Sequence, residues 1–146
     1  MVSHDYLKFW KVIRYFVLRK YDIKSSDLDM LLFLYSEKYF GKEQFNEYNQ
    51  LLTWDTRRFK SLLENGWISV FREKRNNKKT LYEISHKGKS VITTMYKKLN
   101  GEEIPMSSSS NPMFARNVSY FDKVYRNMIK RMNAEIKALR QRRSEQ

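Results

Sequence analysis

The spacing of apolar residues changes at Gly66, and this change constrains the fold more than any other feature of the chain. Before Gly66, apolar residues recur at intervals of three and four, as they do along one face of a helix. After it they alternate, first at Ile68 and Val70 and again at Ile84, with a polar run at residues 75–79 between them. Two alternating runs around a short polar segment are typical of a β-hairpin. The chain is therefore predicted to be mainly α-helical with a small β-hairpin, an α+β fold.

Three helices are predicted in the first part of the chain. Residues 5–21 carry a broad apolar stripe at helical spacing. Residues 25–29 place a serine three positions before an acid, which resembles a capping box and predicts a second, mostly buried helix through Tyr35. Gly41 breaks that helix, and residues 42–50 are expected to form a short third one.

A fourth helix is predicted immediately before the hairpin, over residues 54–65. Thr53 suits its N-cap, because a threonine hydroxyl can accept a hydrogen bond from a first-turn amide. Gly66 suits its end, where a left-handed backbone conformation is common. Beyond the hairpin, Ser85 is expected to cap a fifth helix with an apolar inner face.

The remaining residues are predicted to form a linker and one long helix. Residues 101–112 contain prolines and a serine tract, a composition typical of a flexible linker. Asn111 and Pro112 suit the start of a helix, which is expected over residues 113–143. Residues 1–100 would then form one domain, joined by the linker to a C-terminal helix.

The charge of the chain points to a polyanionic partner. Lys and Arg number 29 against 16 Asp and Glu, which gives a net charge of +13. The basic excess lies in residues 67–100 and 116–146, whereas residues 25–66 lean acidic. A uniformly solvated surface would not predict this uneven distribution. Because a basic field attracts polyanions over long distances, nucleic acid is the first partner to consider.

The predicted order of helices, hairpin and helix is that of a winged helix-turn-helix. Two stretches sharpen this interpretation: Leu62–Ile68 and, after the hairpin, Ile84–Gly88. They resemble the end of the recognition helix and the strand-to-helix junction of MarR-type transcriptional regulators. The resemblance covers about residues 5–100 and implies a homodimer that binds duplex DNA, with the terminal helices joining the subunits. Members of that family usually carry an Asp in the wing, and residues 75–80 contain none.

The fourth helix is the first candidate DNA-binding element. With Phe59 turned inward, helical geometry directs a set of polar residues outward or to the flanks. Arg can donate two bonds to guanine, Ser and Thr can reach either type of base, and first-turn amides can hold a phosphate. The alternative is a solvated helix face with no ligand. The residues assigned to DNA here are Thr53, Trp54, Arg57, Arg58, Lys60 and Ser61.

The hairpin is the second candidate. Basic residues surround a tip formed by Asn76 and Asn77, and near the tip only Glu73 opposes them. Such a tip suits the DNA backbone or a minor groove, whose negative potential attracts Arg and Lys. The alternative is a sheet edge that lysines protect from aggregation. The residues assigned to DNA here are Arg72, Lys74, Arg75, Asn76, Asn77, Lys78 and Lys79.

The last and first helices are candidates for a dimer interface. Apolar residues recur from Phe114 to Met132 at alternating intervals of four and three, a seam typical of paired helices. A stripe of this kind is most often core, and it could fold back on its own domain. Because it follows a linker and a domain already complete, we expect it to pack against a second subunit. The expected interface residues are Trp10, Ile13, Val17, Phe114, Val118, Phe121, Tyr125, Met128 and Met132.

Candidates for catalytic or metal-binding chemistry are few. The chain has no cysteine, and its two histidines, His4 and His86, are too few for a histidine-based metal cage. There is no glycine-rich phosphate loop, and the carboxylates have better interpretations as caps and helix surface. We therefore expect no enzymatic activity and no cofactor. No apolar run approaches the length that spans a bilayer, so we expect a cytoplasmic, nucleoid-associated protein.

These features together predict a sequence-specific transcriptional regulator that binds double-stranded DNA as a homodimer. The chief alternative is a winged helix protein that serves interaction or assembly, such as a replication or virus-encoded accessory factor, or that binds RNA. The acidic-leaning helices over residues 25–51 offer this alternative some support, since a fold does not determine its function.

Overall fold

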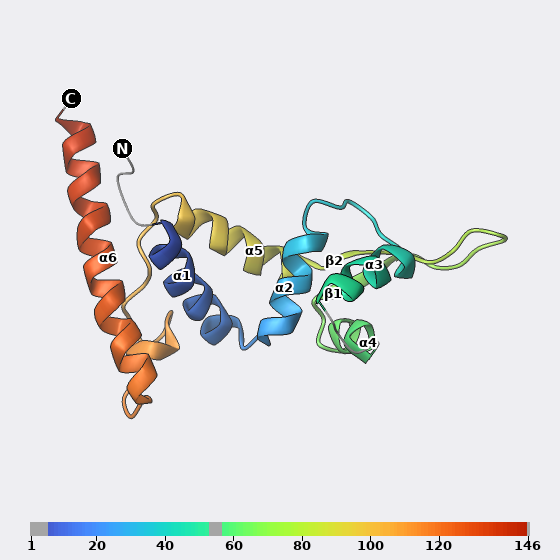
Figure 1. Ribbon diagram of the computed structural model, residues 1–146, viewed down its shortest axis with the longest axis horizontal. Helices are drawn as coiled ribbons and strands as arrows, with labels where there is room; N and C mark the ends of the chain where they lie inside the picture. Colours follow the sequence, from blue (N-terminus) through green and yellow to red (C-terminus); the bar gives the residue numbers. More distant parts are fainter. Residues whose placement is uncertain (1–5, 53–56, 146) are drawn as a thin grey trace. The chain divides into compact units, whose positions relative to one another are not determined.

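The computed structural model describes residues 6–52 and 57–145. Within these ranges the protein is mainly helical, with 6 α-helices and one two-stranded antiparallel sheet, as the sequence predicted (Figure 1). The elements in chain order are α1 Tyr6–Tyr21, α2 Ser25–Leu34, α3 Lys42–Leu52, α4 Arg57–Glu64, β1 Ile68–Arg72, β2 Leu81–Ile84, α5 His86–Leu99, the 3₁₀ helix η1 Pro112–Phe114 and α6 Tyr120–Ser144. None of these helices is long and apolar enough to cross a membrane.

The chain divides into two compact units. Unit 1 consists of Met1–Ile23 and Thr94–Gln146, and unit 2 consists of Lys24–Thr93. The boundary falls inside α5. This division differs from the predicted one, in which residues 1–100 form a domain by themselves, because α1 contacts η1 and α6.

The core of unit 2 is built on α2, where Leu28 and Leu34 are fully buried and which packs against α3. α2 begins at Ser25, but the predicted serine cap is wrong. The Leu28 amide donates a hydrogen bond of 3.0 Å to the Lys24 carbonyl, so Lys24 is the N-cap and Ser25 already lies within the helix. No side chain caps α2 at Lys24.

The hairpin pairs β1 with β2 in antiparallel register, with Ile68 opposite Ile84. The register shifts between Val70 and Arg72, as in a β-bulge. Tyr82 also forms an isolated bridge with Phe40, through backbone hydrogen bonds of 2.8 and 3.0 Å. Sequence reasoning missed this bridge, because a single paired residue has no alternating pattern.

The two stretches that flank the hairpin meet in unit 2. Gly66 ends α4 with a φ of 76°, as predicted, and the Trp67 amide donates a hydrogen bond of 3.0 Å to the Leu62 carbonyl. Ser85 caps α5, as predicted: its hydroxyl accepts a hydrogen bond of 3.0 Å from the Gly88 amide and donates one of 2.6 Å to the Gly66 carbonyl. A β-carbon at Gly88 would lie 2.4 Å from the Trp67 carbonyl oxygen, so only glycine allows this approach. These contacts join the base of the hairpin to the end of α4.

The last helix of unit 1 begins later than residue 113, and that prediction is wrong. Asn111 does cap a turn, since its side chain accepts a hydrogen bond of 3.1 Å from the Met113 amide, but that turn is the short helix η1. Asn117 then adopts a left-handed φ of 58°. Ser119 supplies a new N-cap for α6 by accepting a hydrogen bond of 3.2 Å from the Asp122 amide.

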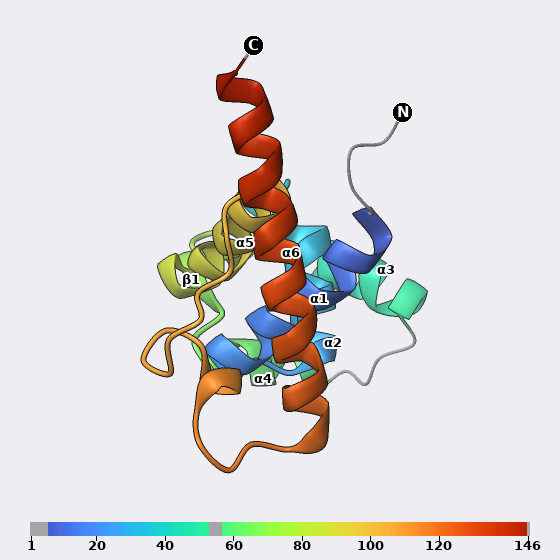
Figure 2. The same cartoon turned by 90° about the vertical axis from the view of Figure 1, so that its left-hand side faces the viewer.

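Side chains from α6 bond to α1, and Figure 2 shows the two helices side by side. The rings of Tyr15 and Tyr125 stack with centroids 3.9 Å apart. The buried Asp122 carboxylate accepts hydrogen bonds from the Tyr15 hydroxyl, at 2.6 Å, and from Arg19, at 3.0 Å. Burial, together with this hydrogen bond to Asp122, raises the pKa of Tyr15 to about 12.

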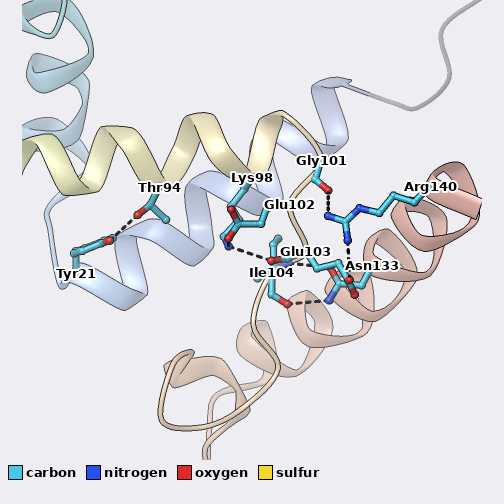
Figure 3. A network of polar contacts seen from close by, with 9 residues as sticks. All are labelled: Tyr21, Thr94, Lys98, Gly101, Glu102, Glu103, Ile104, Asn133 and Arg140. Carbon is cyan, nitrogen blue, oxygen red and sulfur yellow. Dashed lines mark hydrogen bonds and ion pairs between the residues drawn. The ribbon is translucent and has the colours of Figure 1, made fainter. Parts of the chain in front are cut away.

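The segment expected to be a flexible linker is anchored to α6 (Figure 3). Ile104 is buried, and Asn133 bonds to both its backbone groups at 2.9 Å, accepting from the amide and donating to the carbonyl. Glu103 lies within 3.5 Å of Lys137 and 3.4 Å of Arg140. The composition of the segment suggested a linker, but the apolar Ile104 side chain and its bonded backbone groups are packed.

Candidate nucleic-acid interface

α4 presents two sides of different character. The buried Phe59 ring meets the rings of Phe45 and Tyr82 edge-on, with centroids 4.9 and 4.7 Å apart. These aromatic contacts hold one side of α4 against α3 and the hairpin. Arg57 and Lys60 are exposed; helical geometry had predicted Arg57 to point outward and Lys60 to lie on a flank.

Two local polar contacts lie on the exposed side of α4, which keeps its cationic character. Lys60 lies 3.7 Å from Glu64, an exposed pair that contributes little to stability. Ser61 is half-buried and accepts a hydrogen bond of 3.1 Å from the Asn65 amide group. Thr53 and Trp54, which were also assigned to DNA, lie outside the described residues.

Arg58 differs from the other cations of α4, because it is half-buried and its charge acts on the interior of unit 2. The group it acts on is the buried carboxyl of Asp27, in α2. Burial raises the pKa of Asp27, while the charges of Arg58 and Lys24 oppose this rise. The sequence placed Arg58 on a flank of the helix but contained no sign of this buried acid.

The hairpin tip is closed by two residues, as predicted. The Arg75 amide donates to the Lys78 carbonyl at 3.2 Å, and the Lys78 amide donates to the Arg75 carbonyl at 3.1 Å. Asn76 adopts a left-handed φ of 57°, which asparagine tolerates better than most residues. Asn77 completes the tip and is exposed.

Cations near the tip differ in their partners. Lys74, Arg75 and Lys78 are exposed. Lys79 is exposed too, but it forms an ion pair with Glu43 of α3. The hydrogen bond and charge of Lys79 lower the pKa of Glu43. Lys79 is thus tied to α3, a pairing between distant segments that the sequence did not show.

The base of the hairpin exposes apolar side chains that sequence reasoning missed. Val70 and Phe71 are both exposed, and the Phe71 ring stacks on Tyr39 with centroids 3.8 Å apart. The irregular register next to Arg72 disturbs the alternation that would have predicted which residues face inward. Arg72 itself is half-buried, and its Nε has no hydrogen-bond partner within the described ranges.

The expected dimer-interface residues all lie in unit 1 and differ in exposure. Those buried within the unit are Ile13, Val17 and Met132, and those half-buried are Trp10, Phe114, Val118, Tyr125 and Met128. Phe121 is 70% exposed, and its neighbour Tyr120, in edge contact with it, is 76% exposed. The buried members are core residues of their own chain, whereas Phe121 on α6 is left uncovered.

The described residues contain no group of three or more His, Cys, Asp or Glu side chains that could hold a metal ion. The chemistry that α4 and the hairpin offer is that of their exposed guanidinium and ammonium groups, which can donate hydrogen bonds to phosphates and to base edges.

Comparisons with protein-family models, with curated proteins and with solved structures find no match to this chain. The resemblance to MarR-type regulators therefore depends on the two stretches around the hairpin and on the order of elements.

Proposed function

We propose that this protein binds double-stranded DNA through a winged helix-turn-helix in unit 2 and regulates transcription as a homodimer of the MarR type. The observation that carries the proposal is the exposure of cations on two successive elements of one unit, α4 and the hairpin. The element order supports it: α2, the paired residue Phe40, α3, α4, the hairpin and α5 follow one another as in a winged helix.

In this proposal α4 reads bases in the major groove. A helix fits that groove, and an exposed arginine can donate two hydrogen bonds to guanine O6 and N7. Arg57 is assigned to a base, and Lys60, on the same exposed side, to a neighbouring phosphate. The half-buried Arg58 is assigned no direct contact with DNA.

The hairpin acts as the wing. Arg75 and Lys78 flank its tip and are exposed, so they can enter a minor groove or bind phosphates on either side of it. Lys74 adds to the same field. Lys79 contributes less, because its charge is already compensated by Glu43.

Selection from a pool of random duplexes tests this function. The full-length protein should enrich a discrete motif and, as a homodimer, two half-sites whose centres lie about one helical turn apart or a multiple of it. Binding must also fall steeply with salt, because phosphate contacts release counterions. If the protein retains duplexes without enriching any sequence, or binds none, the proposal of a sequence-specific regulator is wrong.

The alternative of an interaction or assembly protein is favoured by one observation on the helix pair α2 and α3. Phe33 and Leu51 are exposed large apolar residues in unit 2, at 41% and 71%. Such residues suit a protein partner better than a phosphate backbone. If the full-length protein enriches no sequence from the pool of duplexes but binds another protein, this second function is favoured.

The homodimer is proposed to form through the exposed part of the α6 seam, at Tyr120, Phe121 and Val124. Light scattering at tens of micromolar, a concentration at which moderate affinities are populated, should give the mass of a dimer. Phe121→Glu should reduce it to a monomer, since a charge would be placed in an apolar contact. Met106→Glu, at an exposed apolar residue outside α1 and α6, is the matched control. A monomeric wild-type protein contradicts the prediction.

A further inference from the structure

The basic excess of residues 116–146 lies outside the two elements assigned to DNA, and most of it lies on α6. This helix buries one side within unit 1, where Ile129, Met132 and Ile136 are almost fully buried. No described element of unit 1 covers its other side, since α1 lies on one side of α6 only (Figure 1 and Figure 2). Glu135 is the only exposed acid within Tyr120–Ser144. The exposed cations include Lys123, Lys130, Arg131, Lys137 and Arg142.

Three of these cations form a row along the helix axis. Lys123, Lys130 and Lys137 are spaced by seven residues, close to two turns of an α-helix, so their side chains leave α6 in nearly the same direction. At the usual rise per residue, this row is about 20 Å long. Arg131 and Arg142 lie on the adjoining exposed side. The five residues are called the α6 basic surface.

Local interactions explain part of this charge but not the start of the row. The helix dipole favours Arg142, in the last turn, whereas it disfavours a cation such as Lys123 near the start of the helix. Lys137 lies 3.5 Å from Glu103, which partly compensates its charge. Lys123 and Lys130 have no ion pair within the described ranges. Their charges are therefore exposed and uncompensated by the protein.

Neighbouring cations of α6 also repel one another. Arg126 lies three residues after Lys123 and four residues before Lys130, the spacings at which side chains are neighbours on a helix. Like charges at these spacings oppose helix formation. A surface that served solubility alone would mix both signs of charge and avoid this repulsion. A bound polyanion would relieve it.

A linear polyanion suits the α6 basic surface better than a membrane does. A helix that binds in a membrane interface inserts its apolar side, but most of the apolar side of α6 is buried within unit 1. The exposed large apolar residues of α6, already assigned to the dimer contact, lie only in its first two turns. Duplex DNA carries one negative charge per about 1.7 Å of its axis, so a length equal to the lysine row presents about a dozen charges.

We propose that the α6 basic surface binds the phosphate backbone of double-stranded DNA without sequence preference, as a second DNA contact of the protein besides unit 2. Lysine ammonium groups are point charges that suit phosphates, and they lack the planar fork with which arginine pairs with guanine. This inference rests on the proposed function for the identity of the polyanion. It assigns additional affinity to unit 1 and leaves sequence preference to unit 2.

The first experiment removes three charges of the surface from the full-length protein. The variant with Lys123→Gln, Lys130→Gln and Arg131→Gln should bind a random-sequence duplex about tenfold more weakly or worse at about 0.1 M salt. It should lower the slope of log affinity against log salt by about one per contact removed. The ratio of affinities for the selected and random duplexes should stay unchanged, because phosphate contacts carry no sequence information. Fluorescence anisotropy over a range of salt concentrations measures all three.

A matched variant removes the same charge and the same residue types elsewhere in unit 1. It carries Lys11→Gln, Lys97→Gln and Arg116→Gln, at exposed residues outside α6. Its affinity and salt slope should stay close to those of the wild-type protein. If it loses as much as the α6 variant does, DNA is attracted by the net charge alone, and the α6 basic surface is not a binding site.

A charge-conserving variant separates charge from side-chain shape. Lys123→Arg, Lys130→Arg and Arg131→Lys together should keep the wild-type affinity and slope, because phosphates require a positive charge rather than one particular cation. If this variant binds as weakly as the glutamine variant, the contact depends on side-chain geometry and the proposal is wrong. Urea denaturation should show that the glutamine variant is at least as stable as wild type, since it loses only exposed, mutually repelling charges.

Vesicles of phosphatidylserine and phosphatidylcholine test the other anionic surface. If the glutamine variant loses binding to vesicles but keeps its affinity for random duplexes, the surface serves a membrane and the proposal is wrong. The duplex measurements also separate this inference from the proposed function. If the wild-type protein binds duplexes without enriching any sequence, the proposed function is wrong and the α6 variant still decides the inference. If the α6 variant matches wild type on random duplexes, the inference is wrong and the proposed function stands.

Discussion

Polar side chains of unit 1 bond largely to their own chain, whereas several cations of unit 2 are exposed on α4 and at the hairpin tip. In unit 1, Asn133 and Asp122 are almost fully buried, and each joins α6 to another segment through two hydrogen bonds. In unit 2, Arg57, Arg75 and Lys78 are exposed at the surface.

The difference separates stability from binding. A buried hydrogen-bonding group is costly to remove, because its partner then loses its bond without gaining water. An exposed cation contributes little to folding, because water solvates it in the folded and unfolded states alike. Substitutions of the buried polar residues of unit 1 should therefore change the free energy of unfolding, and substitutions of the exposed cations on α4 and at the tip should change binding to DNA.

The largest effect is expected at Asn133. Asn133→Ala removes both bonds to the backbone of Ile104 and leaves a buried amide and carbonyl unsatisfied, which should lower the free energy of unfolding by about 3 kcal/mol. Urea denaturation measures this, with Lys130→Ala, at an exposed residue of α6, as the control. A loss no larger than that of the control would show that the segment around Ile104 is not anchored.

The next largest effect is expected at Arg57, in binding rather than folding. Arg57→Ala should weaken binding to the selected duplex by about 1–3 kcal/mol and binding to random duplexes by much less, because a lost base contact penalises only the right sequence. Arg57→Lys keeps the charge but not the two-bond geometry, so it should also lose selectivity. Fluorescence anisotropy on both duplexes gives the two affinities. An unchanged ratio would mean that α4 does not read bases.

A smaller effect on stability is expected at Tyr15. Tyr15→Phe removes the hydrogen bond to Asp122 and should lower the free energy of unfolding by about 1 kcal/mol at neutral pH. Because the pKa of Tyr15 is raised to about 12 from 10.0, its contribution is present below pH 10.0 and is lost as the pH rises toward about 12. Urea denaturation across this alkaline range should show the difference between the two proteins shrinking. A difference that stays constant would contradict the shift.

The smallest effect is expected at the wing. Lys78→Ala should weaken binding to all duplexes alike and lower the slope of log affinity against log salt by about one. Lys79→Ala is the matched comparison, and it should change the slope by less because Glu43 already compensates its charge. Equal slope changes for the two lysines would show that the ion pair with Glu43 does not persist when DNA binds.

The sequence alone determined the features that depend on neighbours in the chain. The apolar spacing predicted the helices, the alternating runs predicted the hairpin, and Gly66 and Ser85 marked the end of α4 and the start of α5. Each of these depends on local backbone preference or on a side chain that reaches an amide a few residues away. The same local rules placed Arg57 on the outer side of α4 and Lys60 on its flank.

Only the tertiary structure decided which polar groups are buried and what they meet. Local patterns suggested a serine cap for α2, a linker over residues 101–112 and a helix from residue 113, and the structure differs at each of the three. Asn133 holds a segment 29 positions away, and Asp27 is acted on by Arg58 from another helix. Burial and electrostatic pairing depend on distances in space, which spacing along the chain does not contain.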